Sequence, residues 1–201
     1  MIKGNHLAHL DEVLESFNYH GTGNDRDVAQ WDEAASYLSN WMLTRSRVLK
    51  AACFHQGWTV IFDPEMVMAS DEDACQALST TAQARVFGMT CEGASNTYAF
   101  SLFDGKKIRG YFAVDGEVFE DFGDPLPEES GLNSDKAYFE DDILEIMQRI
   151  GMNYDKVIGE STHFVIKELD EGDENPSELP PQEINQEDPD KPKKLWWQFW
   201  K

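Results

Sequence analysis

The sequence predicts an α+β protein built on an antiparallel β-meander packed with helices. Three observations support this fold class. Four strand-like runs follow one another between Arg85 and Phe122, two of their connections contain Asp-Gly, and segments of helical periodicity lie on both sides of them. Asp-Gly suits the positive φ angles of tight hairpin turns, and helices on either side of such strands can cover the sheet.

The predicted strands form two groups and a final single strand. The meander is expected over 85–91, 97–103, 107–114 and 117–122, with Asp104-Gly105 and Asp115-Gly116 separating its last three strands. Two earlier strands are expected over 48–54 and 59–62, joined near Gln56-Gly57, and a last strand over 161–167. β-Branched and aromatic residues bounded by turn residues are typical of such strands.

Apolar residues at helical spacing predict four helices. They are expected over 7–17, 27–43, 71–82 and 139–150, and 19–24 is expected to be a turn between the first two. Ser70 and the three acids after it resemble a capping box at the start of the third helix. Gly151 is the expected residue just beyond the end of the fourth helix.

The composition divides the 201 residues into one domain and an appendage. Residues 1–167 are the predicted globular domain, 168–190 an acidic disordered linker, and 191–201 a docking tip rich in Lys and Trp. The linker contains ten acidic residues, no basic residue and four prolines. Apolar residues are too sparse there to offset the entropy of ordering the chain.

The charge excludes several classes of function. The chain has 17 Lys and Arg against 38 Asp and Glu, a net charge of -21. We therefore expect no direct nucleic-acid binding, which needs a basic surface. No apolar run approaches the roughly 20 residues of a membrane-spanning helix, and we expect no secretory signal. Three cysteines without a CxxC motif favour a reducing, cytoplasmic location.

Catalytic combinations are sparse, and we expect neither an enzyme nor a cofactor. The main alternative is Cys53 with His55, which share one face of a strand. A reactive thiol needs an exposed, electropositive setting, and Cys53 follows two alanines in an acidic chain, so a core position is favoured. Cys75 and Cys91 are expected to be small apolar packing residues.

Histidines near the N-terminus carry two further candidates that we do not favour. His6 and His9 have i, i+3 spacing, but no second Cys/His cluster completes a tetrahedral metal site. His20 precedes Gly21-Thr22-Gly23, which matches neither common phosphate-binding loop. We therefore expect no resident metal.

Carboxylates are concentrated between Asp115 and Glu145, where twelve acids accompany one base. EF-hand spacing is absent. A solvated rim is the favoured interpretation, an interface for a basic protein is the second, and a carboxylate-based enzyme site is a further alternative. The acidic surface candidates are Asp115, Glu117, Glu120, Asp121, Asp124, Glu140, Asp141 and Asp142.

The tip contains half of the six tryptophans within its last six residues. Burying such side chains is favourable, so a protein partner is the expected destination. The alternatives are docking on the chain's own domain and a membrane interface, the latter opposed by the acidic linker. The candidate partner-binding residues are Lys193, Lys194, Leu195, Trp196, Trp197, Phe199 and Trp200.

Two resemblances bear on function. In plan only, 168–201 resembles the acidic tails and hydrophobic tips of bacterial single-stranded DNA-binding proteins, which implies a tethered docking tip and nothing about DNA. The run Phe62-Asp63-Pro64-Glu65-Met66-Val67, with 98–127 and its Phe103-Asp104-Gly105 and Asp115-Gly116-Glu117 turns, is similar to small uncharacterised bacterial α+β proteins. Some of those are immunity partners in toxin systems, which implies an inhibitor.

We therefore expect a non-enzymatic cytoplasmic interaction protein, an immunity-type inhibitor or an adaptor. Its acidic surface would bind a basic protein and its tip would add a second contact. A small enzyme and a peripheral membrane protein held by the tip are the alternatives. The oligomeric state stays open because sheet edges offer a pairing surface.

Overall fold

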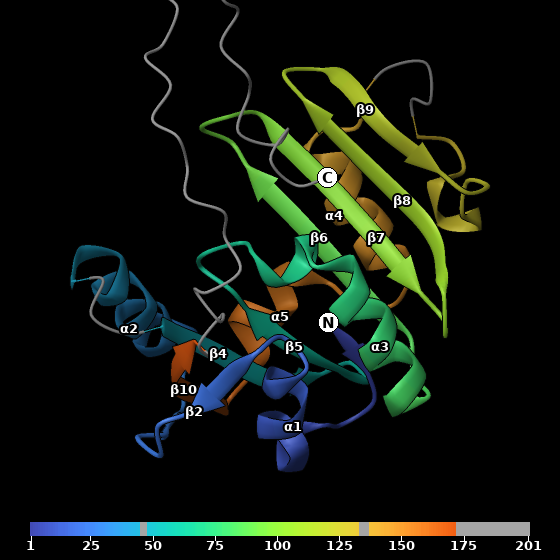
Figure 1. The fold of residues 1–201 in the computed structure, drawn as a ribbon. Coiled ribbons are helices and arrows are strands. Elements are labelled where there is room, and N and C mark those ends of the chain that lie inside the picture. Colours follow the sequence, from blue (N-terminus) through green and yellow to red (C-terminus); the bar gives the residue numbers. More distant parts are fainter. Residues whose placement is uncertain (45–47, 133–136, 172–201) are drawn as a thin grey trace, which may run out of the picture.

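A sheet of ten antiparallel strands runs through the centre of the molecule (Figure 1). The computed structural model describes residues 1–44, 48–132 and 137–171. Neighbouring strands follow the order β2-β10-β4-β5-β1-β6-β7-β8-β9, and β3 also pairs with β10. The predicted α+β class and antiparallel meander are confirmed.

The elements are bounded as follows. The strands are Ile2–Lys3 (β1), Tyr19–Gly21 (β2), Arg26–Val28 (β3), Val48–His55 (β4), Trp58–Phe62 (β5), Val86–Glu92 (β6), Thr97–Phe103 (β7), Lys107–Val114 (β8), Glu117–Phe122 (β9) and Phe164–Glu171 (β10). The α-helices are Leu10–Glu15 (α1), Trp31–Thr44 (α2), Glu72–Ala82 (α3), Glu140–Arg149 (α4) and Tyr154–Glu160 (α5). Short 3-10 turns occupy Leu7–His9, Met68–Ser70 and Pro127–Glu129.

The hairpins follow from their turn residues. Gln56 and Gly57 have φ of 50° and 81° between β4 and β5, and Asp115 and Gly116 have φ of 51° and 80° between β8 and β9. Two consecutive positive φ angles match the right-handed twist of the flanking strands. The meander and the earlier hairpin therefore form where the sequence predicts them.

The four predicted helices are present, with shifted ends. Asp71 caps α3 by accepting a hydrogen bond from the Ala74 amide at 2.9 Å. Gly151 follows α4 with a φ of 98°, as expected for a helix-terminating glycine. The second helix begins at Trp31 instead of near Asp27, because the preceding residues pair with β10 as β3.

Four short elements were missed. The region 19–24, expected to be a turn, begins with β2, which pairs with β10. Ile2 in β1 lies between Thr59 of β5 and Val86 of β6, so two residues join the halves of the sheet. Strands β1, β2 and β3 form through tertiary pairing, and they are too short to show an apolar–polar alternation in the sequence. Helix α5 also went unpredicted; the Asn153 side chain caps it by accepting from the Lys156 amide at 3.0 Å.

The predicted boundary between domain and linker is also four residues too early. Strand β10 continues to Glu171, and Leu169 within it is buried. Glu168 and Asp170 alternate with that buried residue, so their acidity reflects one face of a strand. The rest of the predicted linker and the whole tip lie outside the described residues.

Helices cover both faces of the sheet. Figure 1 shows α4 and α5 behind it and α3 in front. The largest core cluster joins α2, α4 and α5 to one face and includes Trp58, Phe87, Phe100 and Ile146. Smaller clusters lie under α1 and α3 on the other face.

Candidate functional site

The outer strands of the meander present apolar side chains that none of the described helices covers. Helix α3 packs against β6 and the adjoining end of β7, and β8 and β9 extend beyond it (Figure 1). Alternation and strand register place one set of side chains on this side. We call its apolar members the open face; they are Ala99, Phe112, Val114, Phe119 and Phe122. Glu117 and Glu120 lie on the same side, opposite Val114 and Phe112.

Two phenylalanines of the open face are unusually accessible. Phe119 is 43% exposed and Phe122 is 49% exposed. The ring of Phe119 lies 5.9 Å from that of Phe112, measured between centroids. Exposed apolar patches on small proteins commonly mark interaction sites, whereas single exposed residues do not.

Strand β9 is the edge of the sheet beside this surface. Among the described residues, β8 is its one strand partner. The register shifts between Phe112 and Ala113, which pair with Glu120 and Val118, so Phe119 is the extra residue of a β-bulge. Bulges disturb the regular edge that another strand would extend, and they re-aim side chains. Here the bulge turns Phe119 toward Phe112.

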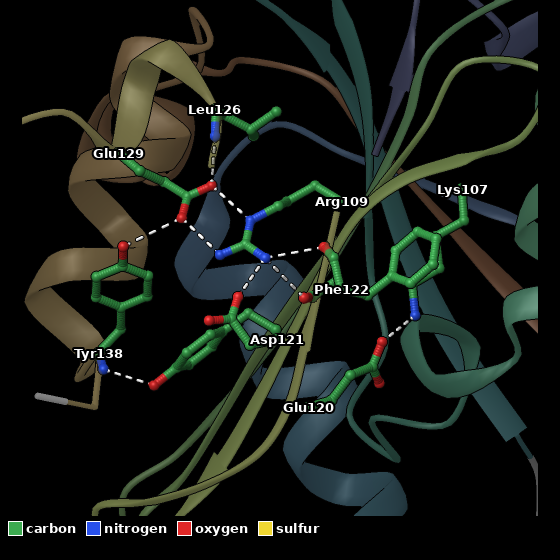
Figure 2. Close-up of polar contacts among 10 residues, drawn as sticks. Lys107, Arg109, Glu120, Asp121, Phe122, Leu126, Glu129 and Tyr138 are labelled. Atoms are coloured by element: carbon green, nitrogen blue, oxygen red, sulfur yellow. Dashed lines mark hydrogen bonds and ion pairs between the residues drawn. The ribbon is translucent and has the colours of Figure 1, made fainter. Parts of the chain in front are cut away.

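Lys107 fixes one side of the open face. Its ammonium group donates to the carboxylates of Glu72 on α3 and Glu120 on β9, and it lies 5.3 Å from the centre of the Phe122 ring. Figure 2 shows the contact with Glu120. Burial by itself lowers the pKa of Lys107, but the two carboxylates outweigh it and the pKa is raised. A Cβ at Gly110 would overlap the ends of the Lys107 and Glu120 side chains, so the present position of this ion pair depends on the absence of a side chain at Gly110.

A buried ion pair holds the same strands from the opposite side of the sheet (Figure 2). Arg109 and Glu129 are 2% and 4% exposed. Two parallel hydrogen bonds of 2.8 Å join the guanidinium to the Glu129 carboxylate. Arg109 also donates to Asp121 at 2.5 Å and to the Phe122 carbonyl at 2.8 Å. Bidentate geometry of this kind is strong and directional.

Glu129 brings further groups into the network. Its carboxylate accepts from the Tyr138 hydroxyl at 3.1 Å and from the Leu126 amide at 2.8 Å. Burial alone lowers the pKa of Arg109, yet its hydrogen bonds to Glu129 and Asp121 raise it overall. The network therefore ties the residues after β9 to the sheet and holds the edge strand in place.

The eight acidic candidates do not form one surface. Glu117 and Glu120 border the open face, whereas Asp121 faces the other side and binds Arg109. Asp115 accepts from the Asn96 amide group in the hairpin turn at 3.0 Å. Asp124 follows β9, and Glu140, Asp141 and Asp142 form the first turn of α4. Acids at that position stabilise a helix through its dipole.

The Cys53–His55 pair has the shared strand face but an unfavourable environment. Cys53 is 0% exposed, and the Ser161 hydroxyl lies 3.7 Å from its sulfur. Burial raises the pKa of the thiol to about 11, although Ser161 acts in the opposite direction. His55 Nε2 is 3.9 Å from the Glu160 carboxylate, beyond hydrogen-bonding distance. A thiol that stays protonated at neutral pH is a poor nucleophile.

The three candidate histidines make contacts with nearby residues or lie in a paired strand. His6 Nε2 lies 3.1 Å from the Lys3 carbonyl, and His9 Nδ1 lies 3.1 Å from the Glu12 carboxylate. His20 lies in β2, which pairs with β10. Within the described part of the chain, no group of three or more His, Cys, Asp or Glu is arranged to hold a metal.

Neither of two cavities in the described structure has the character of a ligand site. One, between α3 and the sheet, has about 110 Å³ and is lined mainly by apolar groups including Met68, Cys75 and Met89. It is smaller than the roughly 300–1,000 Å³ of most ligand pockets. The other, about 420 Å³, is a surface depression between Gln56 and Gln148 whose amide groups bond to Asn153. Neither concentrates reactive groups.

The residues of the tip, Lys193 to Trp200, lie outside the described structure. No helix in 1–44, 48–132 or 137–171 has the length and apolar character needed to cross a membrane.

Sequence reasoning selected the acids of β9 but missed its phenylalanines and Lys107. The adjacent pair Val118-Phe119 interrupts the apolar–polar alternation of the strand, which is a signal for a bulge. Which side of the strand a helix leaves uncovered depends on tertiary packing, and no local pattern records it.

No known protein family, curated protein or solved structure matches the chain.

Proposed function

We propose that this chain is a protein-binding protein, an inhibitor or adaptor of the immunity type, whose open face docks a basic partner. One observation carries the proposal: an uncovered apolar sheet face bordered by Glu117 and Glu120 on a chain of net charge -21. The partner segment should carry apolar or aromatic side chains together with Lys or Arg.

The two components of this surface have different roles in binding. Phe112, Phe119 and Phe122 offer area to exclude from water, and aromatic anchors of this kind dominate the affinity of many interfaces. The negative field of the chain accelerates encounter with a basic protein and disfavours acidic ones. A basic enzyme whose cleft accommodates the open face would be inhibited.

The support of β9 from both sides favours this proposal over an incidental patch. Lys107 packs on Phe122 from the open side, and Arg109 binds the Phe122 carbonyl from the other side. A surface held in its binding conformation loses little entropy on association. The tip would add a second, tethered contact and raise the effective concentration at the partner.

A matched pair of full-length variants tests the proposal. Phe119→Asp places a charge on the open face, and Phe54→Asp places the same charge at a residue of similar exposure, 40% against 43%, on β4. Proteins bound from native lysate would be quantified for wild type and both variants. Identified partners would then be purified and titrated at low and high NaCl.

We expect a basic protein that binds wild type and Phe54→Asp alike, loses at least tenfold in affinity with Phe119→Asp, and weakens as salt rises. Equal binding to all three chains would contradict the proposal, and so would a partner whose affinity does not change with NaCl concentration. Circular dichroism and thermal unfolding of each variant would exclude loss of fold as the cause.

A further inference from the structure

We propose that in the free chain the open face is covered by the chain's own C-terminal tip, residues 191–201. The inference rests on the proposed function in treating the open face as a binding surface, and it adds how access to that surface is regulated. A partner would have to displace the tip, which would then be released to make a second contact.

Charge complementarity selects the tip as the occupant. Residues 191–201 contain four lysines and no acid, whereas 1–190 contain the other 13 bases and all 38 acids, a net charge of 13 − 38 = −25. The open face is bordered by Glu117 on β9, next to Asp115 in the turn. Opposite charges beside a shared apolar contact fix orientation as well as attraction.

Side-chain chemistry is complementary as well. The tip offers Leu195, three tryptophans and Phe199, and the open face offers three phenylalanines with Ala99 and Val114. Offset and edge-to-face ring pairs form readily between such groups. The lysines beside the tip's aromatic residues can also approach aromatic ring faces, as Lys107 does over Phe122.

The chain between β10 and the tip is long enough. Strands β10 and β8 are six positions apart in the sheet order, which at about 4.8 Å per strand is roughly 29 Å. The 23 residues 172–194 precede Leu195. A flexible chain of that length has a root-mean-square span of about 26 Å and an extended reach of about 75–80 Å. Matching span and separation maximises the effective concentration of a tethered ligand.

Other occupants fit less well. Two copies packed through their open faces would bring Glu117 and its equivalent together, and like charges oppose that contact. An anionic membrane would be repelled by the same residue. The tip carries the opposite charge.

Photocrosslinking in the full chain tests the inference. Phe119→p-benzoylphenylalanine puts the reactive group on the open face, and Phe54→p-benzoylphenylalanine is the control at similar exposure. Phe54 is on β4, the neighbour of β10, although at the end of β4 away from Val48, which pairs near the C-terminal end of β10. A tip that merely sampled the surface from its tether would therefore reach Phe54 at least as often as Phe119. We expect crosslinks from Phe119 to 195–200 at least fivefold above those from Phe54.

Mixing heavy-isotope and light chains shows whether the crosslinked tip belongs to the same chain or to a second copy. Crosslinks within one chain support the inference, and crosslinks mainly between heavy and light chains would overturn it in favour of a second copy. Equal yields from Phe119 and Phe54 would overturn it as well.

A competition experiment gives an independent readout. A fluorescent peptide of sequence 191–201 would be titrated into wild type and into the full chain with Trp196, Trp197, Phe199 and Trp200 changed to Ala. We expect the alanine variant to bind the peptide at least tenfold more tightly, because its open face is free. Equal affinities would contradict the inference.

The outcomes separate this inference from the proposed function. A basic partner that needs Phe119, found without any crosslink to the tip, leaves the proposed function standing and overturns the inference. Crosslinks to the tip without any basic partner support the inference and count against the proposed function.

Discussion

Arg109 connects the sheet, the edge strand and the following loop through one buried guanidinium. It bonds to Glu129 by two parallel contacts, to Asp121 and to the Phe122 carbonyl. Removing Glu129 would leave Arg109, which is 2% exposed, with Asp121 as its remaining carboxylate and without its two parallel hydrogen bonds. That loss at a buried charge costs far more than an exposed pair contributes.

Glu129→Ala should therefore lower the free energy of unfolding by about 3–5 kcal/mol. The control is Asp104→Ala, which breaks an ion pair with Arg85 at 3.0 Å whose side chains are both more than half exposed. Exposed pairs contribute about 1 kcal/mol or less. Urea unfolding of both variants measures the difference, and comparable losses would show that Glu129 is not buried as described.

Cys53 combines complete burial with a raised pKa of about 11. At pH 8 its thiolate fraction should be on the order of 100-fold below that of an ordinary cysteine, whose pKa is about 8.5. We expect iodoacetamide to label Cys53 at least 100-fold more slowly in the native protein than in guanidinium chloride, measured by mass spectrometry. Native labelling as fast as in the unfolded chain would restore Cys53 as a candidate nucleophile.

At the scale of elements, the turn after β9 sets the path of the loop that Glu129 anchors. Gly123 has a φ of 81°, and a Cβ there would overlap the Ile108 carbonyl oxygen. Gly116, in the β8–β9 turn, has nearly the same φ of 80° with no atom within 4 Å of its Cβ position. Comparing substitutions at the two glycines therefore separates the cost of a left-handed backbone from the cost of steric overlap.

Gly116→Ala should cost about 1–2 kcal/mol, the usual penalty for a left-handed backbone. Gly123→Ala should cost clearly more, because the added methyl group would overlap the backbone carbonyl oxygen of Ile108, which cannot swing aside as the end of a flexible side chain can. Chemical denaturation measures both costs, and faster amide exchange in β9 would report the local effect. Equal costs would mean that the loop tolerates displacement from Ile108.

The hairpins and the longer helices, which have local signals, were predicted, whereas the short helix α5 and the strands created by tertiary pairing were not. The Asp-Gly and Gln-Gly turns demand positive φ, so hairpins β4–β5 and β8–β9 follow from a few residues. Ile2, in contrast, becomes a strand because Thr59 and Val86 lie on either side of it. The same limit applies to the site: β9 was predicted, but the uncovered side that exposes Phe119 depends on where α3 ends.

At the scale of the whole molecule, part of the acidity has a structural use. Four basic side chains, on β4, β8 and β10, each bind two carboxylates. The four are Lys50, Lys107, Arg109 and Lys167. Each cluster has a net charge of −1, so the fold accumulates negative charge as it pairs its buried and partly buried cations. The negative field that would attract the basic tip therefore comes partly from the fold.

Salt should weaken docking of the tip by screening the attraction between its lysines and the acidic domain. Screening shortens the range of charge interactions from about 14 Å at 0.05 M to about 4 Å at 0.5 M ionic strength, whereas apolar contacts persist. We expect the crosslink yield from Phe119→p-benzoylphenylalanine to fall over that range. A variant with Lys191, Lys193, Lys194 and Lys201 changed to Gln should start lower and change little.

Similar salt dependence in both chains would show that the lysines of the tip do not provide the electrostatic attraction. A yield that rises with salt would mean that repulsion between the acidic residues of 173–190 and the domain dominates. Because the variant keeps every aromatic residue of the tip, the comparison separates the charged contribution to docking from the apolar one.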